Sequence, residues 1–162
     1  MTKSRKILLL GGLALASFSM LYGVYYAVFI EHQTLDGMGG SLSTSFVRAA
    51  ERNTSESQAA LSAYVATKYK YVRHVDAHSH WIGLAMVLIV LGGAFDAVAF
   101  AERLRQVLAW SMLLGSVLFP LAVILQTVDH GSWTRWLAVF GSALVTASLA
   151  GVVVGFARVG PD

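Results

Sequence analysis

Four apolar runs constrain the fold of this chain more than any other feature. They cover about residues 7–30, 78–101, 107–128 and 134–157. A helix needs about 20 residues to cross roughly 30 Å of hydrocarbon, and each run reaches that length. The runs are continuous rather than alternating strands of about ten residues, which excludes a closed transmembrane barrel. We therefore expect one all-α integral membrane domain over residues 1–162, built as a four-helix transmembrane bundle.

The composition agrees with a membrane-embedded chain. Of the 162 residues, 56% are hydrophobic and 13% are charged, whereas soluble domains carry roughly 25% charged residues. One soluble core of this size cannot bury so much apolar surface, and the same proportions exclude a disordered chain. The chain has no cysteine, which excludes disulfides, thiolate metal sites, iron–sulfur clusters and covalent c-type haem. Because no basic run is interleaved with aromatic residues, nucleic acid is not an expected partner.

Basic residues indicate which ends of the runs face the cytoplasm. They lie before the first run, between the second and third runs, and after the fourth: Lys3, Arg5, Lys6, Arg103, Arg105 and Arg158. By the positive-inside rule these segments are cytoplasmic. We therefore expect both termini in the cytoplasm, with the protein in a bacterial inner or plasma membrane.

The long connection between the first two runs, residues 32–75, is expected on the outer side. Its start, Asp36 to Gly40, reads Asp-Gly-Met-Gly-Gly and is typical of a turn. From about Ser45 the residues favour helix, and Asn53 followed three positions later by Glu56 is typical of a helix N-cap. We expect an outer amphipathic, extramembrane helix that leads into the second run.

All five histidines fall at the predicted outer side, and each lies near a carboxylate. The histidines are His32, His74, His78, His80 and His130, and the acids are Glu31, Asp76 and Asp129. Imidazoles from three separate connections are therefore expected in one layer of the membrane. A helix that enters lipid rarely begins with two histidines and an aspartate unless they serve a purpose. Interfacial histidines can also stay half-solvated with no ligand, so a site without a cofactor is the alternative.

Spacing limits what the histidines of the second run can do together. His74 and His78 are four residues apart and share a helical face, as Asp76 and His80 do. His78 and His80 lie about 200° apart around a helix and cannot both ligate one ion. Either the helix starts near His78, or these residues serve different roles.

The first chemistry that fits the histidines is haem b. It needs one or two neutral imidazoles, an apolar slot and cations for its propionates. His80 is the best axial candidate, and His130 or His32 could supply the opposite ligand. Arg73 and Arg135 lie near the outer edge, where propionates would point.

Two other chemistries fit the same residues. A copper or zinc site could take half of its ligands from two residues four positions apart, either His74 with His78 or Asp76 with His80. His32 or His130, from another connection, could complete the site. A quinol site could use a His–Asp pair to take protons at the outer surface.

Asp96 is the one acid inside an apolar run. Helical rise places it about 24 Å from His80, near the inner interface. We expect it to pair with Arg103 or Arg105, with a role in a proton path as the alternative.

A local resemblance bears on the haem hypothesis. From Asp76 to Met86 the chain reads Asp-Ala-His-Ser-His-Trp-Ile-Gly-Leu-Ala-Met and resembles the second helix of the haem–copper oxidase and nitric-oxide reductase catalytic subunits. In that superfamily a haem-ligating histidine stands near the start of this helix, so the resemblance implies His80, or else His78, as an axial ligand. Those subunits are much longer, and the copper-ligating histidines of their later helices have no counterpart here. The resemblance therefore implies a reduced, haem-carrying relative rather than oxygen or nitric-oxide reduction.

These observations predict a haem b-binding redox and electron-transfer subunit with its site at the outer face, held within a larger complex. One alternative is a copper-binding membrane subunit or metal-handling protein that uses the same histidines. Another is a structural accessory subunit without a cofactor. The expected partners are the lipid bilayer, other membrane subunits, and quinol or a periplasmic electron carrier.

Overall fold

The described part of the chain, residues 1–158 of a computed structural model, contains helices and no strand. α1 (Lys3–Tyr26) continues through a π-helical segment (Ala27–Glu31) into α2 (His32–Ala50). α3 (Thr54–Ala94) ends in a 3-10 turn (Phe95–Ala97), and α4 (Glu102–Leu125) and α5 (Ser132–Ala157) follow. Four continuous rods result, each long and apolar enough to span a membrane: Lys3–Ala50, Thr54–Ala97, Glu102–Leu125 and Ser132–Ala157.

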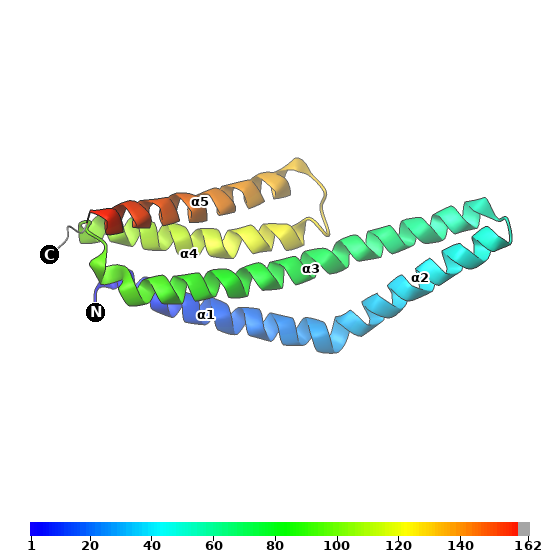
Figure 1. Cartoon of the computed structure of the whole chain (residues 1–162), viewed down its shortest axis with the longest axis horizontal. Coiled ribbons are helices and arrows are strands. Elements are labelled where there is room, and N and C mark those ends of the chain that lie inside the picture. Colours follow the sequence, from blue (N-terminus) through cyan, green and yellow to red (C-terminus); the bar gives the residue numbers. More distant parts are fainter. Residues whose placement is uncertain (159–162) are drawn as a thin grey trace.

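The rods form a bundle with one long extension (Figure 1). The start of α1 and the end of α5 lie at the same end, which we call the terminal end. α2 packs along the first half of α3, and the pair projects beyond the loop between α4 and α5. We call α2 and residues 54–68 of α3 the projecting hairpin.

The predicted turn at Asp36 to Gly40 is wrong, because these residues lie within α2. Gly37, Gly39 and Gly40 face open space on the exposed side of the helix. A glycine costs a helix about 1 kcal/mol relative to alanine, and packing of α2 along α3 offsets that cost. The predicted N-cap is confirmed. Asn53 precedes α3, and its side-chain Oδ1 accepts a hydrogen bond of 3.2 Å from the Glu56 backbone N–H.

A continuous seam on α3 and the 3-10 turn that follows it faces α1 and α2. Its residues recur at alternating steps of three and four, the repeat of a left-handed coiled coil. Every member is buried or half-buried: Ser57, Ala60, Tyr64, Thr67, Tyr71, His74, His78, Trp81, Ala85, Leu88, Gly92 and Phe95. The seam therefore joins the projecting hairpin and the bundle in one packing interface, and two histidines belong to it.

The opposing seam on α1 and α2 contains one residue too many. Counting on from the buried Tyr26 in the same alternating steps of four and three residues reaches Ile30 and then positions 33, 37, 40, 44 and 47, and all five of these later positions are exposed. The residues that do face α3 come one position later: Thr34, Met38, Ser41, Ser45 and Arg48. This shift of one position occurs in the π-helical segment. A π-helical turn contains one more residue than an α-helical turn, so it accommodates the extra residue. The rod bends at the same place (Figure 1).

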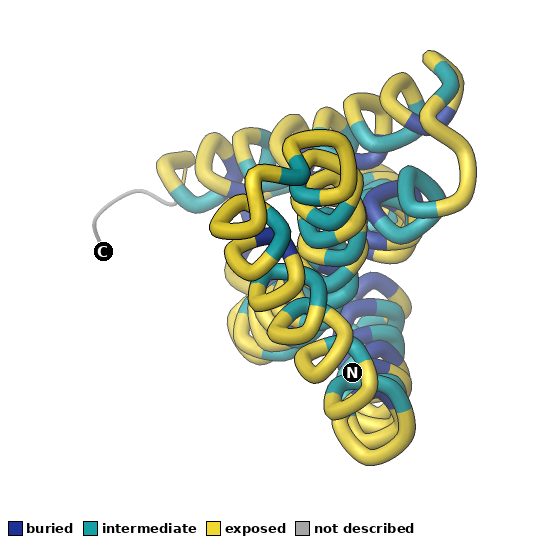
Figure 2. The backbone as a smooth tube through the Cα atoms, turned by 90° about the vertical axis from the view of Figure 1, so that its right-hand side faces the viewer, coloured by how far each residue is buried: buried dark blue, intermediate teal, exposed yellow. Residues whose placement is uncertain are grey.

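Buried residues lie along the faces where the helices meet, and the outward faces are exposed (Figure 2). The core includes Leu8, Trp81, Leu88 and Phe95. The outward faces carry large exposed hydrophobic side chains, which suit a surface covered by lipid.

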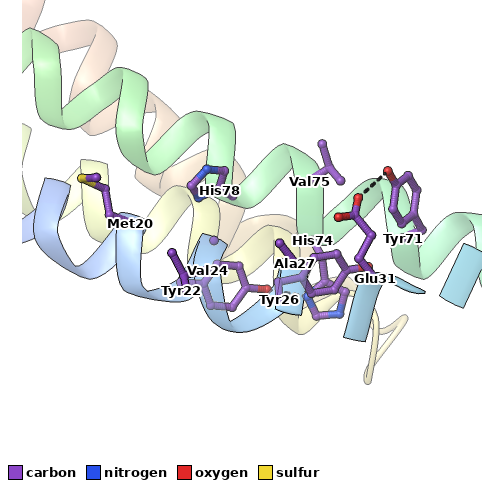
Figure 3. A pocket seen from close by; sticks show the side chains of 11 residues that line it. Met20, Tyr22, Val24, Tyr26, Ala27, Glu31, Tyr71, His74, Val75 and His78 are labelled. Atoms are coloured by element: carbon purple, nitrogen blue, oxygen red, sulfur yellow. Dashed lines mark hydrogen bonds between the residues drawn. The ribbon is translucent and has the colours of Figure 1, made fainter. Parts of the chain in front are cut away.

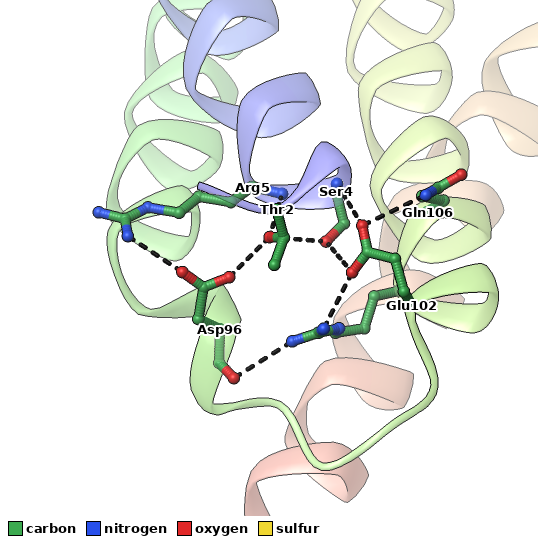
Figure 4. Close-up of polar contacts among 7 residues, drawn as sticks. Thr2, Ser4, Arg5, Asp96, Glu102 and Gln106 are labelled. Carbon is green, nitrogen blue, oxygen red and sulfur yellow. Dashed lines mark hydrogen bonds and ion pairs between the residues drawn. The ribbon is translucent and has the colours of Figure 1, made fainter.

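A polar network joins three helices at the terminal end (Figure 4). Asp96 accepts a hydrogen bond of 2.6 Å from the Thr2 hydroxyl and forms an ion pair of 3.0 Å with Arg5. Arg105 donates instead to the backbone carbonyl of Asp96 and forms an ion pair with Glu102. The prediction that the Asp96 carboxylate pairs with Arg103 or Arg105 of α4 is therefore wrong. Its partner is Arg5, because the start of α1 lies beside the carboxylate.

We predict that removing one residue from the π-helical segment is tolerated, whereas adding one is not. Deletion of Val28 restores an uninterrupted α-helix and keeps α2 in its seam, so the thermal midpoint should stay the same or rise. Insertion of an alanine after Val28 moves the α2 seam away from α3 and should lower the midpoint by about 5 °C or more. Thermal unfolding in detergent measures both. Equal destabilisation of the two variants would show that the segment does not accommodate an extra residue.

Candidate functional site

The five histidines lie at the level where the projecting hairpin meets the bundle, but they face different neighbours. His74, His78 and His80 all lie within α3, so the helix does not begin near His78. His74 and His78 face α1, whereas His80 lies against α4. The structure therefore favours separate roles for His78 and His80.

His78 is fixed by a reciprocal pair of hydrogen bonds with Ser19 of α1. Its ring Nδ1 donates to the Ser19 carbonyl oxygen at 3.0 Å, and the Ser19 hydroxyl donates to the His78 carbonyl oxygen at 3.2 Å. Because a carbonyl only accepts, Nδ1 carries the proton and Nε2 of the neutral ring keeps its lone pair. Metal-ligating and proton-accepting histidines are commonly oriented in this way.

Gly23 makes this approach of α1 to the imidazole possible. A Cβ at position 23 would lie 2.5 Å from Cε1 of His78 and 2.9 Å from its Nδ1. A glycine is therefore needed for the ring to lie against the backbone of α1.

His74 lies one turn from His78 and contacts two tyrosines of α1. The Tyr22 hydroxyl is 2.5 Å from Nδ1 of His74, and the Tyr26 ring stacks on the imidazole with centroids 5.0 Å apart. Tyr22 also packs edge-on against the buried Trp81. These contacts hold the phenol and the imidazole in one arrangement.

These side chains line an open groove of about 500 Å³ between α1 and α3 (Figure 3). Most of the remaining wall is apolar, and Met20, Val24, Ala27 and Val75 contribute to it. We call this the histidine groove. It combines a hydrophobic surface with a few placed polar groups, which is the usual character of a small-molecule site.

Glu31 and Tyr71 lie at the end of the histidine groove nearest the projecting hairpin (Figure 3). The Tyr71 hydroxyl donates to Oε1 of Glu31 at 3.1 Å. This hydrogen bond raises the pKa of the Tyr71 hydroxyl above its ordinary value, so the phenol stays protonated and remains a hydrogen-bond donor.

The other candidate haem ligands lie apart from one another. The His80 ring is 4.8 Å from the Phe119 ring of α4, and His130 stacks on Tyr69 with centroids 5.7 Å apart. Tyr69 and His80 are separated by about 16 Å of helical rise, so His130 and His80 do not meet across one iron atom. His32 is exposed at the start of α2, beside Glu31.

The remaining predicted residues lie around the same level. Arg73 stacks over the Tyr69 ring at 5.0 Å, and Arg135 lines a small cavity with His130. Asp76 is half-buried on α3. Within residues 1–158, no group of three or more histidine, cysteine or acidic side chains is placed to hold a metal ion. A metal at His74 and His78 would therefore need further ligands from a partner or from water.

Asp129 organises the loop that carries His130. It accepts hydrogen bonds from the Trp133 indole and, at 2.7 Å, from the Gly131 backbone N–H. These donors hold the pKa of the Asp129 carboxyl below its ordinary value. The acid next to His130 therefore has a structural role in the loop and stays ionised at neutral pH.

Ser19, Tyr22, Gly23 and Tyr26 of α1 were not among the site residues predicted from the sequence. One signal was present, because positions 19, 22, 23 and 26 share one helical face. That face combines small, hydroxyl and phenol groups, but only the packing against α3 shows that it meets the histidines.

Comparison of this chain with protein-family models, curated proteins and solved structures finds no match. Its function is therefore inferred from the chemistry of the sites described above.

We predict that Gly23→Ala destabilises the protein by about 1–3 kcal/mol, because the new methyl group displaces the His78 ring from its hydrogen bonds. Gly83→Ala is the matched control, since no atom lies within 4 Å of a Cβ at that position. The control should be neutral or up to about 1 kcal/mol stabilising. Equal thermal midpoints for the two variants in detergent would contradict the close packing at Gly23.

Proposed function

We propose that this protein is a membrane redox subunit that binds the headgroup of a quinol in the histidine groove. The observation that carries the proposal is the grouping of His74, His78 and Tyr22 on the wall of an otherwise apolar groove of about 500 Å³. A quinol has the matching chemistry, since an apolar ring carries two hydroxyl groups that donate hydrogen bonds. The groove opens at the edge of the apolar runs, where a lipid-soluble molecule can present its polar end.

The imidazoles would act as proton acceptors. Oxidation of a quinol to a quinone breaks two O–H bonds and releases two protons and two electrons. Nε2 of His78 has the free lone pair that accepts a proton, because Nδ1 is occupied by the Ser19 carbonyl. The electrons pass to a one-electron carrier held by this chain or by a partner subunit.

Glu31 and Tyr71 support an exit for the protons. They lie at the end of the groove away from the apolar core, and the carboxylate can accept a proton from the imidazoles and pass it to water. In this proposal the projecting hairpin stands outside the membrane on the outer side, both termini are cytoplasmic, and protons leave to the outside.

Binding of a short-chain benzoquinone or naphthoquinone tests the proposal by calorimetry in mild detergent. We expect His74→Phe and Tyr22→Phe each to weaken binding about tenfold, because each removes one protected hydrogen bond of about 1.4 kcal/mol. His130→Phe is the control, since His130 stacks on Tyr69 outside the groove. Unchanged affinity in both groove variants would refute this site.

A second candidate function, haem b binding, has its own supporting observation. His80 is exposed beside Phe119, and within residues 1–158 no hydrogen bond engages its ring. Its imidazole would therefore be available to ligate the haem iron. Bound haem would supply one-electron chemistry to the subunit.

The visible spectrum of the protein purified in mild detergent tests this second candidate, with metal analysis on the same sample. We expect a Soret band that His80→Ala abolishes and His130→Ala preserves. Copper without porphyrin absorption would favour the metal-handling alternative, with His74 and His78 as ligands. Neither cofactor, together with stoichiometric co-purification of larger subunits, would favour the accessory alternative. Either result would end the haem hypothesis.

A further inference from the structure

A second groove, between α1 and α4, begins at the terminal end and is separate from the histidine groove. Its mouth has a volume of about 590 Å³. The mouth carries two lysines, an amide and an indole around an apolar floor: Lys3, Lys6, Ile7, Leu10, Gln106 and Trp110. Trp110 is 59% exposed, as expected of an aromatic side chain at a membrane–water interface.

This groove continues into the middle of the bundle. A second cavity of about 420 Å³ lies farther along α1 and shares Gly11 and Leu113 with the mouth. The Leu113 side chain packs against Gly11 at the boundary between the two cavities. We call the two cavities together the channel. Its wall is hydrophobic and includes Phe18, Trp81 and Val117. From Lys3 to Phe18 the channel follows about 22 Å of helical rise, which matches the depth of one bilayer leaflet.

Positive charge is concentrated at the mouth. The two carboxylates that residues 1–158 place at the terminal end already have cationic partners, since Asp96 pairs with Arg5 and Glu102 with Arg105. Among the described residues, neither Lys3 nor Lys6 has a carboxylate within ion-pair distance. The groove thus offers two ammonium groups at its polar end and only apolar surface beyond them.

We propose that this groove binds an anionic phospholipid. The phosphate lies between the ammonium groups of Lys3 and Lys6, with Gln106 and the Trp110 indole as further donors, and one acyl chain follows the channel toward Trp81. The charge at the mouth favours a lipid over a partner helix, because a phospholipid combines an anionic group for the two lysines with an acyl chain for the apolar wall. Basic pockets between transmembrane helices are a common form of headgroup site.

Native mass spectrometry of the detergent-purified protein tests the proposal with two added lipids of equal chain length. Phosphatidylglycerol should bind at least tenfold more tightly than phosphatidylcholine, and the difference should shrink as salt is raised. Equal binding of the two lipids, or a second copy of the chain in the groove that excludes lipid, would overturn it. This comparison uses the unmodified protein and does not depend on the folding of any variant.

Two variants locate the site. Lys3→Gln combined with Lys6→Gln should weaken phosphatidylglycerol binding about 25-fold, as expected if each lysine contributes about fivefold. Lys68→Gln combined with Lys70→Gln makes the same charge change on α3 away from the terminal end and should have no effect. Ala14→Phe fills the channel without changing charge and should weaken both lipids. If the Lys3 and Lys6 variant binds like the control, the groove is not the headgroup site.

Discussion

The packing of α3 against the single rod formed by α1 and α2 determines the rest of the structure. Twelve seam residues of α3 and the 3-10 turn that follows it run from the tip of the projecting hairpin to the terminal end, and all of them are at least half-buried. Hydrophobic burial at Trp81, Ala85 and Leu88 stabilises the part inside the bundle. Toward the hairpin the same seam positions change to histidine, tyrosine, threonine and serine. The seam is therefore apolar in the bundle and polar in the extension, and the candidate site lies at the transition.

The extra residue in the opposing rod gives the site its shape. A regular helix with one residue fewer in this segment would continue the packing without interruption, whereas the π-helical segment widens the turn and bends the rod. The histidine groove opens beside that segment, and Tyr26, Ala27 and Glu31 contribute to both features. The irregular turn thus separates two regular stretches of packing and leaves room between them for a ligand.

Much of the fold could be predicted from the sequence because the dominant signals are local. A long apolar run in a membrane forms a helix whichever segments pack against it. The Asn53 N-cap can be recognised from four consecutive residues, Asn53 to Glu56. The turn predicted at the glycines of α2 is wrong because these residues are held in a helix by contacts between α2 and α3, which a local sequence pattern does not show. The spacing of His78 and His80 predicted that the two rings lie on different sides of the helix, and in the structure they meet different helices. Which helix each ring meets depends on how the rods are arranged, so the partners Ser19, Tyr22 and Phe119 could not be derived from spacing alone.

The repeat of the seam also restricts how the projecting hairpin can vary in length. Seven residues added to α2 and seven added to the facing part of α3 restore every contact one heptad later, and the tip moves outward by about 10 Å. An addition to only one of the two helices breaks the alignment at Asn53, where the chain reverses. Length changes in relatives of this protein should therefore come in matched multiples of seven. The reach of the hairpin toward a partner can then change in discrete steps while the groove keeps its geometry.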